Sequence, residues 1–61
     1  MQDIARLARI LTEHPEVEFS VLGPGIAVKA EIPGKVPIVR LRLADLLDDL
    51  ESALAERETK L

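Results

Sequence analysis

The sequence predicts a small α+β domain with the order helix, strand, strand, strand, helix. Apolar residues recur with a helical period near both ends of the chain, and between those segments they alternate with polar residues. Turns that contain Gly and Pro interrupt the alternating region and divide it into three strands. We therefore expect one domain over residues 1–61, a three-stranded antiparallel meander with both helices on one face.

The first helix is expected over about residues 2–13. Its apolar stripe follows the i, i+3, i+4, i+7 spacing of an amphipathic helix and consists of Ile4, Leu7, Ala8 and Leu11. Pro15 ends this helix, because the residue before a proline is pushed out of helical geometry.

The first two strands are expected to form a hairpin around Gly23-Pro24-Gly25. The residues expected to face the core are Val17, Phe19, Val21, Ile26, Val28, Ala30 and Ile32. Placing Val21 opposite Ile26 aligns two opposite charges on the outer face. These charges are Glu18 and Lys29, a favourable cross-strand pair.

The third strand is expected over about residues 36–43, after a turn with Pro33 and Gly34 at its two central positions. Val39, Leu41 and Leu43 would face the core, and Ile38, Arg40 and Arg42 would face outward. Placing Val39 opposite Ile32 brings Arg40 opposite Glu31. Pro37 cannot donate to a ladder, so this strand is expected at an edge of the sheet.

The second helix is expected over about residues 45–59, with Asp45 as its N-cap. Its leucine stripe has two interpretations, the core face against the chain's own sheet or a surface that packs against a partner chain. As a subunit interface the stripe comprises Leu46, Leu47, Leu50, Leu54 and Leu61. The band is wider than one small sheet needs, so both interpretations stay open.

The chain has 61 residues and no cysteine, so its single core has no disulfide bond to stabilise it and is near the limit of independent stability. With 48% hydrophobic residues it is too apolar to be disordered by composition. Self-association would stabilise the fold, so we expect a homo-oligomer, a dimer or higher. The absence of cysteine, of a signal peptide and of a long uncharged apolar run favours a cytoplasmic protein without membrane contact.

The net charge of −3 conceals a bipolar distribution. Residues 35–43 hold three cations and no anion, whereas the last eighteen residues hold six acids and two bases. The overall charge and the single aromatic residue, Phe19, disfavour nucleic acid as a partner. DNA binding by the outer sheet face of a dimer would require the glutamates of that face to be kept away from phosphates.

The sequence offers little for catalysis, and we expect neither an enzyme nor a cofactor. Histidine ordinarily titrates near neutrality, and the only one, His14, adjoins Pro15 at the end of a helix. Asp45 and Asp49 are the only close i, i+4 acidic pair in the first turns of the second helix, and no calcium-loop pattern is present. We expect a solvated polar face there and no metal site.

Three cations are candidates for binding an anion: Lys35, Arg40 and Arg42. Two arginines at i and i+2 project from one strand face, and a symmetry-related copy could double them into a pocket for a small anion such as a nucleotide. The opposing interpretation pairs Arg40 with Glu31 and Arg42 with the acidic helix of a neighbouring chain.

The function that the sequence favours is a non-catalytic, intracellular protein-interaction or adaptor module that acts as a homo-oligomer. Its candidate partner surface is the acidic face of the second helix, formed by Asp48, Asp49 and Glu51. The alternative is an oligomer that binds a small anionic ligand through the basic strand at the subunit interface.

Overall fold

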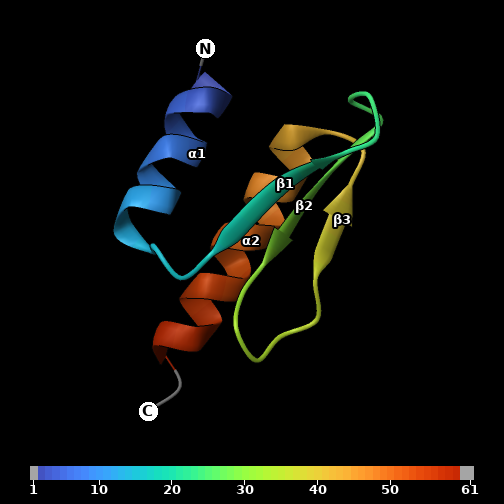
Figure 1. Cartoon of the computed structure of the whole chain (residues 1–61). Coiled ribbons are helices and arrows are strands. Elements are labelled where there is room, and N and C mark those ends of the chain that lie inside the picture. The colour runs from blue at the N-terminus through green and yellow to red at the C-terminus, as the bar shows by residue number, and fades with distance from the viewer. Residues whose placement is uncertain (1, 60–61) are drawn as a thin grey trace.

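The computed structural model describes residues 2–59 as a helix, three antiparallel strands and a second helix (Figure 1). The elements are α1 (Gln2–Glu13), β1 (Glu18–Leu22), β2 (Ala27–Glu31), β3 (Ile38–Arg40) and α2 (Leu43–Thr59). The strands form one antiparallel sheet in the order β1-β2-β3. The predicted α+β class, the element order and the edge position of the third strand are confirmed.

Helix α1 has the predicted bounds, but its buried face is rotated from the predicted stripe. Ile10 is its buried residue, with Leu7 and Leu11 packed against the core, whereas Ile4 is exposed. These residues face α2, which is the main packing partner of α1. A hydrogen bond from the His14 N–H to the Ile10 carbonyl oxygen (2.8 Å) closes the last turn of the helix.

The hairpin has a register two residues away from the expected one. Val21 pairs with Val28, and Ile26 belongs to the turn, where its N–H donates to the Leu22 carbonyl oxygen (3.2 Å). Because side chains alternate between faces, a shift of two residues leaves each side chain on the same face. The predicted inner face of β1 and β2 is therefore retained, although the predicted partners are wrong.

The shifted register removes the expected ion pair across the hairpin. Glu18 lies opposite Glu31, and Lys29 approaches Glu31 within its own strand (3.1 Å). An exposed ion pair contributes less than about 1 kcal/mol, which is too little to set the register. The turn sets it instead, since Gly23 and Gly25 adopt the positive φ values, 59° and 79°, that its backbone needs.

Strand β3 is shorter than expected and presents the opposite face. Ile38 pairs with Ala30, an offset of three residues from the expected register, and an odd offset turns every side chain to the other face. Ile38 therefore packs against the core and Val39 is exposed. The turn at Pro33 and Gly34 forms as predicted, but the ladder resumes only after Pro37, which cannot donate to it.

Helix α2 begins two residues before the expected start. The carbonyl oxygen of Arg42 accepts the first helical hydrogen bond, from the Leu46 N–H (3.1 Å), so Asp45 lies within the first turn and the predicted N-cap is wrong. The earlier start brings Leu43 into the i, i+3, i+4 stripe that packs on the sheet.

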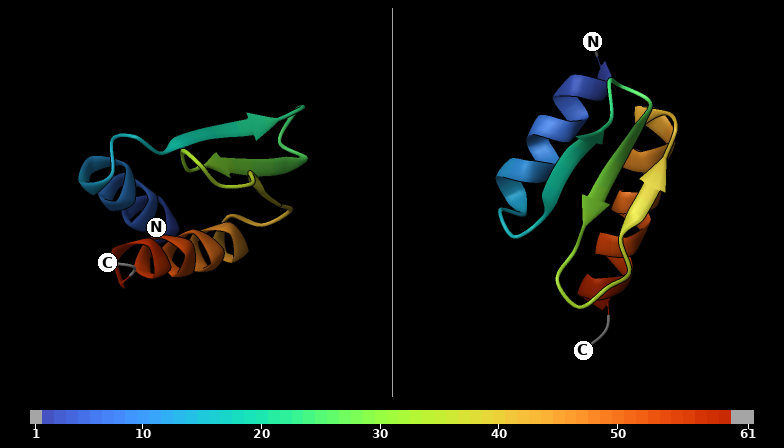
Figure 2. Two further views of the ribbon diagram at one scale, coloured as in Figure 1. Left: turned by 90° about the horizontal axis from the view of Figure 1, so that it is seen from below. Right: turned by 45° about the vertical axis from the view of Figure 1, so that its right-hand side comes forward.

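Both helices lie on the same side of the sheet (Figure 2). Helix α2 packs against β2 and β3, and α1 packs on α2 beside β1. The core lies between these layers and consists of Ile10, Val17, Ala30, Ile32, Leu46, Leu47, Leu50 and Leu54. No other described element covers the opposite face of the sheet.

The molecule is elongated, at 39 × 24 × 18 Å, and its chain reversals are gathered at two ends (Figures 1 and 2). One end holds the start of α1, the β1–β2 turn and the β3–α2 junction. The other holds the α1–β1 loop, the β2–β3 loop and the end of α2. Each element runs against the one before it, so segments far apart in sequence meet at each end.

Candidate functional site

The three cations considered for an anion site lie apart. Arg40 ends β3 and donates from Nε to Oδ2 of Asp49 on α2 (2.5 Å), so its expected pairing with Glu31 is wrong. Arg42 follows the end of β3, so the two arginines do not share a strand face. Lys35 lies in the loop that precedes β3, towards the other end of the molecule.

Lys35 also lies in acidic surroundings. It lines an open hollow of about 320 Å³ together with Glu16, Glu18 and Glu31. A carboxylate near a bound anion repels it, so this part of the surface opposes the binding of a nucleotide or phosphate. Neither the placement of the three cations nor the surroundings of Lys35 supports a shared anion pocket within the chain.

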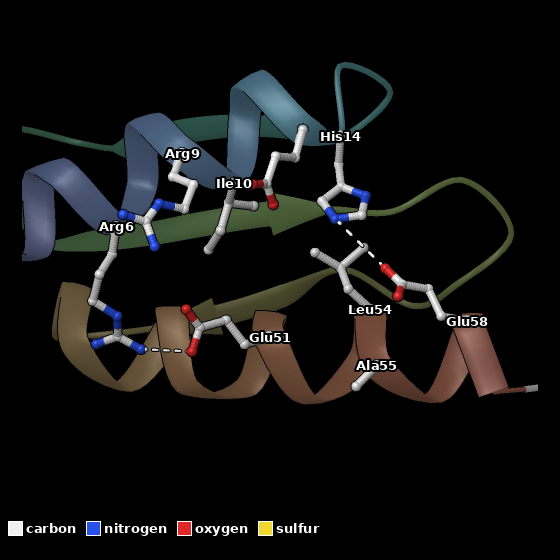
Figure 3. A pocket seen from close by; sticks show the side chains of 9 residues that line it. Arg6, Arg9, Ile10, His14, Glu51, Leu54, Ala55 and Glu58 are labelled. Carbon is white, nitrogen blue, oxygen red and sulfur yellow. Dashed lines mark hydrogen bonds and ion pairs between the residues drawn. The ribbon is translucent and has the colours of Figure 1, made fainter.

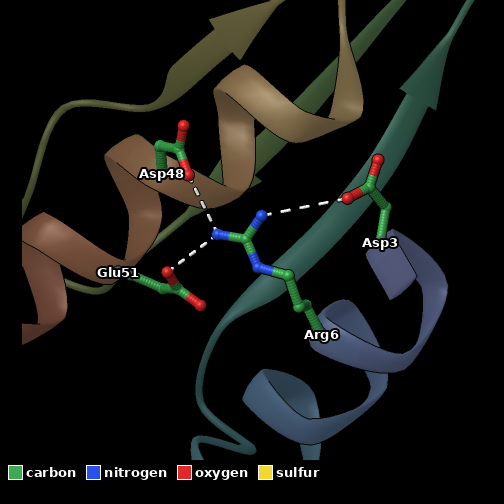
Figure 4. Close-up of polar contacts among 4 residues, drawn as sticks. All are labelled: Asp3, Arg6, Asp48 and Glu51. Carbon is green, nitrogen blue, oxygen red and sulfur yellow. Dashed lines mark hydrogen bonds and ion pairs between the residues drawn. The ribbon is translucent and has the colours of Figure 1, made fainter.

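The acidic residues of α2 are joined to cations of the same chain. Arg6 of α1 donates to Asp48 (2.9 Å) and Glu51 (2.8 Å), and its second terminal nitrogen lies 3.8 Å from Asp3 (Figure 4). The hydrogen bonds to Glu51 and then Asp48 raise the pKa of Arg6 above its usual range. With Asp49 held by Arg40, all three acids considered as a partner surface already have partners within the chain.

Four of the five leucines considered for a subunit interface lie inside the chain. The buried residues are Leu46, Leu47, Leu50 and Leu54. They pack in the core beneath the sheet, which is the alternative interpretation of the stripe. Because they are inaccessible in the single chain, their prediction as an interface is wrong. Leu61 lies outside the described residues.

A groove of about 210 Å³ runs between α1 and α2 (Figure 3). Arg9 and Glu13 of α1 and Glu51 and Glu58 of α2 are among the residues that line it. Both signs of charge line the groove, so it holds no concentration of one sign that would attract a charged ligand. Its polar groups serve mainly to join the two helices, as Arg6 does with Glu51.

The end that holds the α1–β1 and β2–β3 loops carries a group of ionisable residues, and we call it the charged end. It comprises His14, Glu16, Glu18, Glu31, Lys35, Arg57 and Glu58. Here His14 lies between Glu16 (3.7 Å) and Glu58 (3.8 Å), and Arg57 is 3.0 Å from Glu16. Glu16 and Glu31 have cationic partners on the same chain, Arg57 and Lys29, whereas Glu18 and Lys35 make no ion pair among the described residues.

Glu16 is the acid at the centre of this network. A hydrogen bond from its own backbone N–H is the largest cause that lowers the pKa of Glu16, and the charge of Arg57 adds to it. Partial burial acts in the opposite direction but does not prevail. Glu16 is therefore held in its charged form, which lets one carboxylate join the α1–β1 loop to the end of α2.

The opposite end collects large apolar side chains that the fold leaves exposed, and we call it the apolar end. Its residues and exposed fractions are Ile4 (55%), Val21 (53%), Leu22 (36%), Ile26 (66%) and Leu41 (77%). Ile4 and Leu43, together with Gln2 and Asp3, line an open hollow of about 580 Å³ between the starts of the two helices. Clustered exposed apolar residues are uncommon on monomeric proteins and mark interaction surfaces.

The apolar end has one cation and one anion beside it that make no ion pair with any described residue. These are Arg42, directly before α2, and Asp45, in the first turn of α2. Asp3, by contrast, has Arg6 within 3.8 Å of it.

The strand alternation in the sequence assigns three of these apolar residues, Val21, Ile26 and Leu41, to the core, and the structure exposes all three. Val21 and Ile26 flank the Gly23-Pro24-Gly25 turn, and the alternation runs into the turn without a change of pattern. Their location at the tip of the hairpin is the feature of the sequence that predicts their exposure, because a helix packed on the middle of a hairpin leaves the residues at its tip uncovered. The exposure of Ile4 and Leu41 has no comparable signal in the sequence.

No helix within residues 2–59 is long and apolar enough to span a membrane. Over the same residues, no group of three or more histidine, cysteine, aspartate or glutamate side chains is placed to hold a metal ion. Comparison of the chain with family models, with curated proteins and with solved structures gives no match.

Proposed function

We propose that the protein is a non-catalytic interaction module that acts as a homo-oligomer in the cytoplasm, with the apolar end as its contact surface. The observation that carries this proposal is that five exposed aliphatic residues lie on the chain segments at one end of a small domain: the start of α1, the tip of the β1–β2 hairpin and the β3–α2 junction. Covering apolar surface is favourable by about 25 cal/mol per Å². The chain has no further described element that could cover this end.

The charged parts of the surface support the same choice by contrast. The acidic face of α2 is compensated by Arg6 and Arg40, and at the charged end Glu16 is paired with Arg57. Exposed charges that already have partners contribute little to a new interface, since pairing with a second protein would replace one ion pair by another. The apolar end has no such internal compensation.

The proposal is tested by measuring self-association with sedimentation velocity from about 5 µM to about 1 mM, the range in which small, transient interfaces dissociate. The double variant Ile26→Ser with Leu41→Ser should weaken association at least about tenfold, because each side chain contributes on the order of 1.5 kcal/mol or more when fully buried.

Val36→Ser is the matched control for this experiment. Val36 is 85% exposed but lies in the β2–β3 loop, away from the apolar end. Its substitution should leave association unchanged. A wild-type chain that remains monomeric over the whole range, or a control that weakens association as much as the double variant, would overturn the proposal.

A further inference from the structure

We infer that the partner at the apolar end is a second copy of this chain, related by a two-fold axis, with Arg42 of each copy paired to Asp45 of the other. This inference rests on the proposed function and specifies the occupant of the same surface. It starts from the two charges beside the apolar end that remain without ion pairs among the described residues.

Two-fold symmetry demands a surface that is complementary to itself. In such an interface, if one residue contacts a second residue on the other copy, the reciprocal contact must also form. Arg42 and Asp45 meet this demand, because they carry opposite charges and lie three positions apart along the chain at the start of α2. When two copies approach each other in antiparallel orientation, Arg42 of each copy meets Asp45 of the other, and two equivalent ion pairs form.

The charge balance beside this end favours a second copy over a partner of one strong sign. Arg42 and Asp45 sum to zero, Asp3 at the start of α1 lies 3.8 Å from Arg6, and the β1–β2 turn at residues 23–26 contributes no charge. An acidic partner would leave Asp45 repelled, and a basic partner would leave Arg42 repelled. An identical surface repels neither, and it supplies an equal apolar patch.

The arrangement has the usual anatomy of a protein interface, with an apolar centre and a charged rim. Ile26 and Leu41 are the most exposed residues of the apolar end and would supply the centre of the interface, and Ile4 lines the hollow beside Leu43. The end of the molecule spans only the two shorter dimensions, 24 × 18 Å. Such a small interface predicts a dissociation constant of roughly 1–100 µM.

The experiment is a charge swap measured by sedimentation equilibrium. Arg42→Glu alone places a carboxylate near Asp45 of the other copy at both contacts, and Asp45→Lys alone places an ammonium group near Arg42 of the other copy at both contacts. Each single variant should therefore dimerise about tenfold or more weakly than the wild type. Far-UV circular dichroism checks that each variant keeps its helices.

The decisive sample is an equimolar mixture of the two single variants. In a heterodimer of these variants, one contact pairs the introduced glutamate with the introduced lysine, and the other pairs the native Asp45 with the native Arg42. The mixture should associate within about threefold of the wild type, although each component alone associates poorly. A heterologous contact between copies would restore only one pairing and would not favour a closed dimer.

The matched control carries the same changes of charge on α1, as Arg9→Glu and Glu13→Lys. These two residues line the α1–α2 groove, outside the set of residues that forms the apolar end. The control variants should dimerise as the wild type does.

Three results would overturn the inference. Single swaps that leave dimerisation unchanged, while Ile26→Ser with Leu41→Ser abolishes it, would remove the ion-pair arrangement and leave the proposed function standing. A mixture no tighter than its components would exclude the reciprocal pairing. A wild-type chain that stays monomeric at about 1 mM would remove both the inference and the proposed homo-oligomer.

Discussion

The chain reversals at the two ends of this molecule carry different kinds of exposed side chain. At the charged end, Glu16 pairs with Arg57, and His14 lies between Glu16 and Glu58. At the apolar end, aliphatic side chains such as Ile26 are left in contact with water. The comparison indicates that a surface whose groups already have partners serves the fold, whereas a surface without them is available for association.

The same contrast applies along helix α2. Its inner face contains leucines that are buried in the core, and its outer face carries acids that hold Arg6 and Arg40. Only its start, next to the apolar end, presents Arg42 and Asp45 without ion-pair partners among the described residues. Substitutions on these parts of the molecule should therefore distinguish the residues that stabilise the fold from those that are exposed and do not.

The largest effect on stability is expected from the core. Leu50→Ala removes a fully buried side chain and should lower the free energy of unfolding by about 2–5 kcal/mol, measured by urea denaturation at low protein concentration. Leu41→Ala, the exposed counterpart, should change it by less than about 0.5 kcal/mol. Equal losses for the two variants would contradict the assignment of Leu41 to a free surface.

A smaller effect is expected where α1 joins α2. Arg6→Gln removes the hydrogen bonds to Asp48 and Glu51, which leaves two acids of α2 without their cation. Hydrogen exchange of the α1 amides should become faster, and the midpoint of thermal unfolding should fall less than for Leu50→Ala. Arg9→Gln is the control, and an identical change for both arginines would show that the ion pairs of Arg6 are not responsible.

The smallest effect concerns pH at the charged end. Because the pKa of Glu16 is lowered by folding, its contribution to stability is complete above the ordinary glutamate pKa of about 4.3 and is lost as pH falls through the lower folded value. Glu16→Gln should reduce the loss of stability in acid, measured by thermal unfolding between about pH 6 and pH 3. Glu13→Gln is the control, and a wild-type slope in Glu16→Gln would disprove the prediction.

The fold could be predicted from the sequence because its signals are local. Apolar periodicity near both ends marked the helices, and the turn at Pro33 and Gly34 was predicted with the correct central residues. Strand register was harder, because it depends on loop lengths that no residue pattern specifies. The third strand shows the consequence, since an offset of three residues exposed Val39 and turned Ile38 inward.

The candidate site was predicted less well than the fold. Arg42 and the expectation of self-association stay in the proposal, but the interface leucines are buried and the acids of α2 have internal partners. A leucine stripe that packs in the core and one that packs against another chain have the same sequence pattern, since both require one apolar helix face. Only the position of the sheet over α2 distinguishes the two.

By itself, the sequence determined the type and order of the elements, the Gly and Pro turns and the apolar stripe of the second helix. These depend on backbone preferences and on spacing within a few residues. The tertiary structure alone decided which charges are paired and which apolar residues stay exposed. Those outcomes depend on contacts between distant segments, such as Arg6 with Glu51, 45 positions apart, and on where the helices cease to cover the sheet.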